Sequence, residues 1–365
     1  MTEIRPLDRS YNSPMLEILR RSPVEIGGLT MCFDRQPDMF AMADLKYDPP
    51  AWNGVFEDGK LMGFGLVGYH RGFVNGEVQQ VMHLTDCYFH PEARGRGYLT
   101  SALPKFFEGG TASLGYAVKM EGNRGSKVHL RRKFVKTRSG ITTRYFGELT
   151  AQTVLLFLPR RKRSHFPVRR ARMDDIDDIV SLLRDEHKPR LFGLAVDRDR
   201  FVARLNRRPG LSIDDYYVVE HGGKLAGVCA AWDTSAFKQD RVLEYGFWLK
   251  LVRLTTGLAS LAGGFPGLPA PGEPFRNVFL TDWAVRDRSI DILRALIEHT
   301  YCEYRRRGYF SLVFGSCSED PLLEATHGYW VDRLRFGIAL IALNRKWFGE
   351  GALDTRLPFI DVAML

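Results

Sequence analysis

The sequence predicts an α/β fold (an α+β mixed sheet) made of two tandem copies of one unit, each a twisted mixed sheet flanked by helices. Two matches at one offset predict the repetition. Residues 168–183 (VRRARMDDIDDIVSLL) resemble residues 4–19 (IRPLDRSYNSPMLEIL), and Gly223-Lys224-Leu225 repeats Gly59-Lys60-Leu61. Both pairs are 164 residues apart. Two separate matches in one register indicate an internal duplication.

A third match locates an insertion in the second copy. Leu280-Thr281-Asp282 repeats Leu84-Thr85-Asp86 at an offset of 196, which is 32 residues longer than the first offset. The added residues lie between Trp232 and Val278 and include the glycine- and proline-rich stretch GGFPGLPAPGEP, which is typical of a loop. The predicted domains are residues 1–159, a basic linker at 160–167, and residues 168–365.

Apolar patterns predict the elements of the first copy in order. A short edge strand and a helix are expected within residues 4–21, and a hairpin over Trp52–Tyr69 turns at Asp58-Gly59. Further strands are expected at residues 81–89, 112–118 and 153–158. The alternation of strands with helical segments supports a mixed sheet.

The stretch Val81–Leu99 organises the rest of the first copy. It reads as a buried strand, a polar turn after Pro91, and the start of a helix. A glycine-bearing loop before a helix presents unpaired backbone N–H groups and the positive end of the helix dipole, so it can bind phosphate. Arg94 and Arg96 add positive charge beside this loop.

In this setting the stretch resembles the pyrophosphate-binding signature of the GNAT superfamily, the acyl-CoA-dependent N-acyltransferases. The signature is Arg or Gln, two residues, Gly, one residue, then Gly or Ala; Arg94 and Gly97 match it, and Leu99 stands at the last position. The resemblance implies acetyl-CoA or another acyl-CoA as cofactor and a small-molecule or peptide amine as acceptor. It implies cofactor contacts at Cys87, Tyr88, Phe89, Arg94, Gly95, Arg96, Gly97, Tyr98, Leu99 and Asn123.

The second copy lacks the glycine loop. Ile290-Asp291-Ile292-Leu293 is expected to form the turn opposite Arg94–Gly97, and this acidic, glycine-free turn cannot cradle a pyrophosphate in the same way. We therefore expect the chemistry in the first half and a structural or substrate-shaping role for the second.

Three residues are candidates for catalysis. His83 is replaced by Phe279 in the second copy, and an imidazole with a pKa near 6.5 in a shielded cleft could deprotonate an amine. The alternative is a core histidine satisfied by hydrogen bonds. Asp86 is a second candidate base, although its counterpart Asp282 persists without the loop and favours a shared structural role. The resemblance implies a tyrosine as general acid; here His129, next to the matching position, takes its place as a candidate.

Composition bounds the class of protein. The 365 residues and 45% hydrophobic content suit two globular domains. The five cysteines are scattered, and none forms a CxxC pair, so neither a disulfide framework nor a metal site is expected. The first residues contain no apolar signal region, and Lys250 and Arg253 interrupt the apolar tract Phe247–Leu268. We expect a cytoplasmic protein with no membrane span. The overlapping tract Tyr245–Leu268 is expected to form extra core or to line an acyl pocket.

The net charge of +9 favours polyanionic partners. Basic residues concentrate in Arg124–Arg144 and Arg160–Arg163, which are either solvated surface and linker or contacts to RNA phosphates. The leading hypothesis is an N-acyltransferase that uses acyl-CoA. The alternatives are an aminoacyl-tRNA-dependent transferase of related tandem fold and a non-catalytic acyl-CoA-binding module. Nucleic acid is possible but not favoured, because a tRNA-dependent enzyme needs no pyrophosphate loop.

Overall fold

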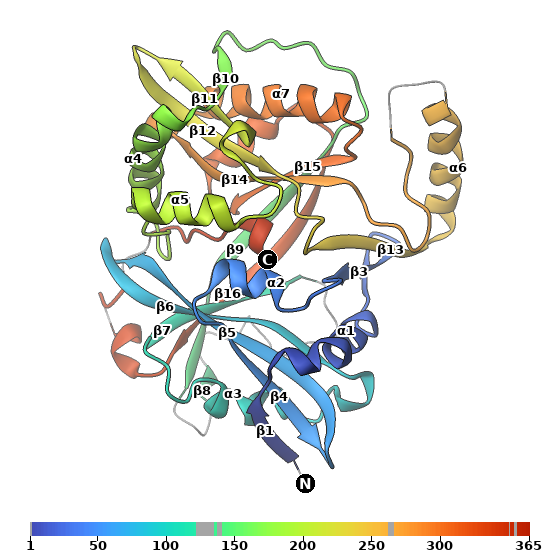
Figure 1. The fold of residues 1–365 in the computed structure, drawn as a ribbon, viewed down its shortest axis with the longest axis vertical. Helices are drawn as coiled ribbons and strands as arrows, with labels where there is room; N and C mark the ends of the chain where they lie inside the picture. Colours follow the sequence, from blue (N-terminus) through green and yellow to red (C-terminus); the bar gives the residue numbers. More distant parts are fainter. Residues whose placement is uncertain (1, 122–134, 137–140, 262–265, 350, 354–355) are drawn as a thin grey trace.

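One large sheet runs through the whole molecule (Figure 1). The computed structural model describes residues 2–121, 135–136, 141–261, 266–349, 351–353 and 356–365. Within them the sheet has 13 strands, in the order β1-β4-β5-β6-β7-β16-β9-β15-β14-β12-β11-β10, with β8 paired to β9. The first half supplies β1 (Thr2–Pro6), β4 (Ala51–Glu57), β5 (Lys60–Val74), β6 (Glu77–Phe89) and β7 (Leu114–Met120). The second half supplies β10 (Val168–Arg170), β11 (Tyr216–His221), β12 (Lys224–Trp232), β14 (Asn277–Val285) and β15 (Ser311–Cys317).

The two halves exchange a strand at the centre of this sheet. β9 (Thr142–Leu155, joined by β8 at Val135–Lys136) belongs to the first half but pairs with β15 of the second. β16 (Val331–Ala342) belongs to the second half but pairs with β7 of the first, and it also pairs with β9. The equivalent strands of the repeat therefore cross over, which makes the sheet continuous.

Seven α-helices are described. The first half contains α1 (Asn12–Arg20), α2 (Ala41–Lys46) and α3 (Tyr98–Phe106); the second contains α4 (Ile176–His187), α5 (Arg198–Arg207), α6 (Phe247–Leu261) and α7 (Ile290–Arg306). Buried apolar residues of α4 and α7 pack on β12 and β14. Among the described residues, no helix combines the length and the apolar character needed to cross a membrane.

A small second sheet joins the halves on one side. It consists of β2 (Val24–Ile26), β3 (Leu29–Asp34) and β13 (Gln239–Tyr245), in the order β13-β3-β2. β13 and α6 occupy the insertion predicted from the difference between the two repeat offsets. That insertion thus holds a strand and a helix as well as the expected loop.

The predicted fold class is confirmed, and most predicted elements are present. β1 and α1 lie within residues 4–21 apart from the first residues of β1, and β4 and β5 form the predicted hairpin. Asp58 and Gly59 turn it with φ of 49° and 80°, as the right-handed strand twist requires of a two-residue turn. The strand expected at residues 153–158 is wrong in its bounds, because β9 begins at Thr142 and ends at Leu155.

The apolar core is shared between the halves. One cluster of buried residues contains Val81 and Tyr116 of the first half together with Phe192 and Val228 of the second. The rings of Tyr116 and Phe192 stack with their centroids 4.8 Å apart. Because sheet and core are both shared, the boundary at residue 159 remains a prediction drawn from the sequence repeat.

Candidate functional site

The candidate site begins where β6 and β7 part. These parallel strands pair only over Met82–Leu84 and Gly115–Ala117. Beyond this point β6 contains a bulge against β5, and Asp86 takes a φ of 47°. The residues that follow on β6, Cys87–Phe89, are half-buried. Parted strands leave backbone N–H and C=O groups that the sheet does not use.

The second half repeats this bulge. Asp282 in β14 takes a φ of 45°, and the register with β12 shifts at the same place. Aspartate tolerates this left-handed conformation better than most residues do. The equivalence of Asp86 and Asp282, inferred from the sequence repeat, is confirmed by the geometry.

The glycine loop lies open at the start of α3. Gly95 and Gly97 have φ of 80° and 79°, and a Cβ atom on either would meet nothing within 4 Å. Gly97 is the N-cap of α3 and supplies no side-chain hydrogen bond to the first turn. The amides at this helix start are therefore available to an anion.

The two arginines of the loop are held by the protein. The Arg94 guanidinium donates to the carbonyl oxygens of Phe89 at 3.2 Å and Arg21 at 2.9 Å. Arg96 donates to a carboxylate oxygen of Glu57 at 3.0 Å. Both side chains remain exposed. Arg94 thus ties the loop to the ends of α1 and β6. The exposed surface of the loop beside α3 is main chain at Gly95 and Gly97.

The corresponding connection in the second half is shorter, and the protein's own side chains cap its helix and pair with its arginine. Residues 90–97 join β6 to α3, whereas residues 286–289 join β14 to α7. Ser289 caps α7 by accepting from the amide of Ile292 at 3.4 Å. The expectation that Ile290–Leu293 forms a turn opposite the loop is wrong, because these residues are the first turn of α7. The loss of the phosphate loop comes from the shortened connection.

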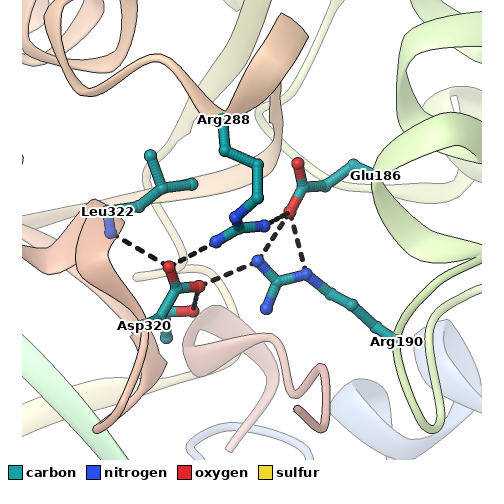
Figure 2. Close-up of polar contacts among 6 residues, drawn as sticks. Glu186, Arg190, Arg288, Asp320 and Leu322 are labelled. Carbon is teal, nitrogen blue, oxygen red and sulfur yellow. Dashed lines mark hydrogen bonds and ion pairs between the residues drawn. The ribbon is translucent and has the colours of Figure 1, made fainter. Parts of the chain in front are cut away.

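Ion pairs fix this shortened connection. Figure 2 shows Arg288 and Arg190 meeting Glu186 and Asp320. Arg190 Nη2 lies 2.8 Å from an oxygen of Asp320, and Arg288 Nη1 lies 3.0 Å from one of Glu186. The side chains of Glu186, Arg190 and Asp320 are at most 4% exposed. Two carboxylates of the protein, those of Glu186 and Asp320, therefore hold Arg288 of this connection.

His83 lies in the core. Its side chain has no exposed surface, and its ring stacks on Tyr116 with the centroids 4.3 Å apart. Nδ1 lies 2.5 Å from the Tyr47 hydroxyl and 3.1 Å from Lys46 Nζ. Burial, and then the charge of Lys46, lowers the pKa of His83 well below its ordinary value. The expectation of a pKa near 6.5 in a cleft is wrong, and the contacts favour the alternative of a core histidine.

The comparisons with known proteins agree with this geometry. Residues 14–116, from α1 into β7, match the model of the acetyltransferase (GNAT) family. The match contains the bulge, the open loop and α3. No curated protein is significantly similar to the chain in sequence.

Solved structures extend the fold likeness beyond the GNAT domain. A GCN5-related N-acetyltransferase from Sphaerobacter thermophilus has a TM-score of 0.58 at 14% identity, with 99% of this chain and 98% of that chain covered. Saccharomyces cerevisiae N-myristoyltransferase with bound myristoyl-CoA has a TM-score of 0.57 at 13% identity, covering 92% and 78%. A probable N-acyltransferase from Enterococcus faecalis has a TM-score of 0.53 at 12% identity, covering 95% and 74%. At these identities the likeness shows a common fold.

The structure describes some of the other predicted site residues and leaves two undescribed. Tyr98 and Leu99 begin α3, where Tyr98 donates to Glu57 at 2.8 Å, and Tyr88 packs against Phe64. Burial, then the nearby charge of Asp86, raises the pKa of the Cys87 thiol to about 12, so this cysteine is a poor nucleophile. Asn123 and His129 lie outside the described residues.

Sequence reasoning missed a cluster of cations around Asp86. Arg35 is 3% exposed, and its Nη2 lies 3.8 Å from Asp86 Oδ1. Lys46 and Lys238 each donate to carbonyl oxygens of residues 362–364, at 2.8 and 3.2 Å. Burial lowers the pKa of each lysine to about 8. These residues come from distant parts of both halves, so no local spacing could have predicted the cluster.

We expect acid to destabilise the protein through its buried histidines. His83 has a folded pKa below 6.5, so the unfolded chain binds more protons under acidic conditions. The stability due to neutral His83 is complete above about pH 6.5 and falls as pH decreases, by about 1.4 kcal/mol per pH unit. Urea unfolding between pH 7 and 5 should show that the free energy of unfolding falls with decreasing pH. In His83→Gln this pH dependence should be weaker by the contribution of His83. The exposed His327 provides the control: His327→Gln should keep the wild-type slope, and an unchanged slope in His83→Gln would contradict the prediction.

Proposed function

We propose that the chain is an N-acyltransferase that moves an acyl group from coenzyme A to an amine, with the chemistry in the first half. The observation that carries this proposal is the open glycine loop, which one copy has and the other has lost. A loop of this kind at a helix start can bind anions, and this capacity supports a cofactor that contains a diphosphate. The GNAT match over residues 14–116 supports acyl transfer.

The described residues suit an acyl-CoA in two places. The uncapped first turn of α3 and the open faces of Gly95 and Gly97 leave room for a diphosphate. Cys87–Phe89 are half-buried and lie just past the point where β6 and β7 separate, and their main chain would orient the pantetheine arm. The cofactor supplies a thioester, whose C–S bond breaks as the amide C–N bond forms. Asn123 as a further cofactor contact is proposed from the resemblance.

The reaction requires two proton transfers. The amine must lose a proton to attack, and the departing thiolate must gain one. We propose Asp86 as the proton acceptor, because it lies at the bulge two residues beyond Leu84, the last residue of β6 that pairs with β7. His83 is proposed as a positioning residue, since its buried ring contacts Tyr47 and Lys46. His129 as proton donor is proposed from the resemblance.

A thermal shift assay tests the proposal. Acetyl-CoA and a long-chain acyl-CoA should each raise Tm by several degrees, because a ligand at about a hundred times its Kd adds about 2.7 kcal/mol. The long chain is included because the N-myristoyltransferase of similar fold is described with myristoyl-CoA. Acetyl-pantetheine, which lacks the diphosphate, should shift Tm little. Equal shifts with acetyl-pantetheine and acetyl-CoA would contradict a role for the loop.

One observation favours a second function, acyl-CoA binding without transfer. His83 is enclosed, and burial lowers the pKa of its imidazole, so this residue offers no accessible base. Release of free CoA thiol in the presence of a panel of amines distinguishes the two functions. The tRNA-dependent alternative gains no support from the linker, where Arg160 lies 4.0 Å over the Tyr329 ring and Lys162 contacts His299.

A further inference from the structure

Helix α6 (Phe247–Leu261) is the most unusual surface feature of the protein. It follows β13 in the insertion that the first copy lacks, and it lies at the periphery in Figure 1. Six of the eleven large apolar side chains exposed in the described residues belong to it: Phe247, Trp248, Leu251, Val252, Leu254 and Leu258. The expectation of extra core is wrong for the described side chains of α6.

The apolar stripe of α6 points outward. Phe247, Leu251, Leu254 and Leu258 follow the spacing of one helix face, and three of them are 65–71% exposed. A surface helix normally turns such a stripe toward the core. Here the inward side is held by Leu249, which lies near Gly28, and by Arg253, which donates to the carbonyl oxygen of Pro269 at 3.1 Å.

The charges of α6 indicate which kind of partner could bind the exposed apolar stripe. Its only charged residues are Lys250 and Arg253, and it contains no acid. Lys250 is 62% exposed at the flank of the stripe and lies 3.9 Å from Glu244. Trp248, at one end, is 76% exposed. Aromatic and leucine side chains with flanking basic residues are typical of helices that lie in the interface of an anionic membrane. Two copies of α6 packed together would bring like charges together.

We propose that α6 docks the protein on the surface of an anionic lipid bilayer. The helix lies in the plane of the interface, with Phe247, Leu254 and Leu258 inserted among the acyl chains. Lys250 remains at the level of the lipid phosphates. This proposal does not depend on acyl transfer.

Vesicle sedimentation with the full chain tests the proposal. Vesicles with about 30% phosphatidylserine should bind the protein at least about tenfold more tightly than pure phosphatidylcholine vesicles at physiological salt. Trp248 fluorescence should shift to the blue on binding. Lys250→Gln should weaken binding about fivefold.

A matched pair of triple variants isolates the stripe. Phe247→Ser, Leu254→Ser and Leu258→Ser together should reduce binding by more than about tenfold. The control replaces exposed apolar residues elsewhere, Leu158, Met173 and Trp330, by serine and should bind like the wild type. Equal binding by the two triple variants would overturn the proposal. Absence of binding to anionic vesicles would do the same, as would a concentration-dependent dimer that only the α6 triple variant abolishes.

Discussion

Replacement of Gly97 by valine should reduce the affinity for acyl-CoA by about a hundredfold or more, which is about 2.7 kcal/mol. Gly97 has a φ of 79° at the N-cap of α3, and a β-branched residue is strained in this conformation. The added side chain would project into the open space that we assign to the diphosphate. It would also shield the first-turn amides. Isothermal titration with acetyl-CoA measures the loss.

A second glycine separates this effect from backbone strain. Gly109, just beyond the other end of α3, has a φ of 74°, and a Cβ there would also meet nothing within 4 Å. Gly109→Val should therefore lose similar stability but keep its affinity for acetyl-CoA. If Gly97→Val and Gly109→Val bind acetyl-CoA equally well, the loop does not hold the cofactor.

The sequence predicted the features that arise from local patterns. The strand–loop–helix at Val81–Leu99 and the equivalence of Asp86 and Asp282 depend on neighbouring residues and on a fixed repeat offset, and the structure contains both. Strand exchange is different: β9 pairs with β15 and β16 with β7, and the apolar pattern of either strand would be the same if it joined the other half. The apolar pattern of a strand determines which side chains face the core, whereas the segments that link the strands determine which strands pair.

The errors at the candidate site have a common physical cause. His83 was predicted from its chemistry and from its replacement by Phe279, but its pKa depends on burial by Tyr47 and Tyr116, which the sequence does not show. The cluster of Arg35, Lys46 and Lys238 was missed for the same reason. Desolvation and long-range charge pairing are properties of the folded chain.

The strand exchange couples the two halves at the candidate site. The loop-bearing half takes β16 from the other half beside β7, so the second copy completes the sheet that forms the site. Its own connection between strand and helix is the shorter one, at residues 286–289. The second half thus contributes β16 beside the candidate site, and Lys238 brings one of its side chains to the cations near Asp86.

Removal of the Asp320 carboxylate should destabilise the protein by about 3–5 kcal/mol. Asp320 has no exposed side-chain surface, and it accepts from Arg190, Arg288 and Ser316 as well as from the Leu322 amide. Although burial alone would raise the pKa of Asp320, the charge of Arg190 and the hydrogen bond from Ser316 hold it below its ordinary value. Asp320→Ala leaves the 3% exposed Arg190 guanidinium with Glu186 as its one carboxylate partner.

Urea unfolding of Asp320→Ala and of a surface control measures this cost. The control is Asp291→Ala, which removes a carboxylate that is 72% exposed and lies 3.6 Å from Arg294. Its free energy of unfolding should change by less than about 0.5 kcal/mol, as is usual for exposed pairs. A loss below about 1 kcal/mol in Asp320→Ala would mean that Arg190 and Arg288 find other acceptors. A loss in the predicted range would support Asp320 as the internal carboxylate that holds residues 286–289, whereas residues 90–97 of the first half form the open loop.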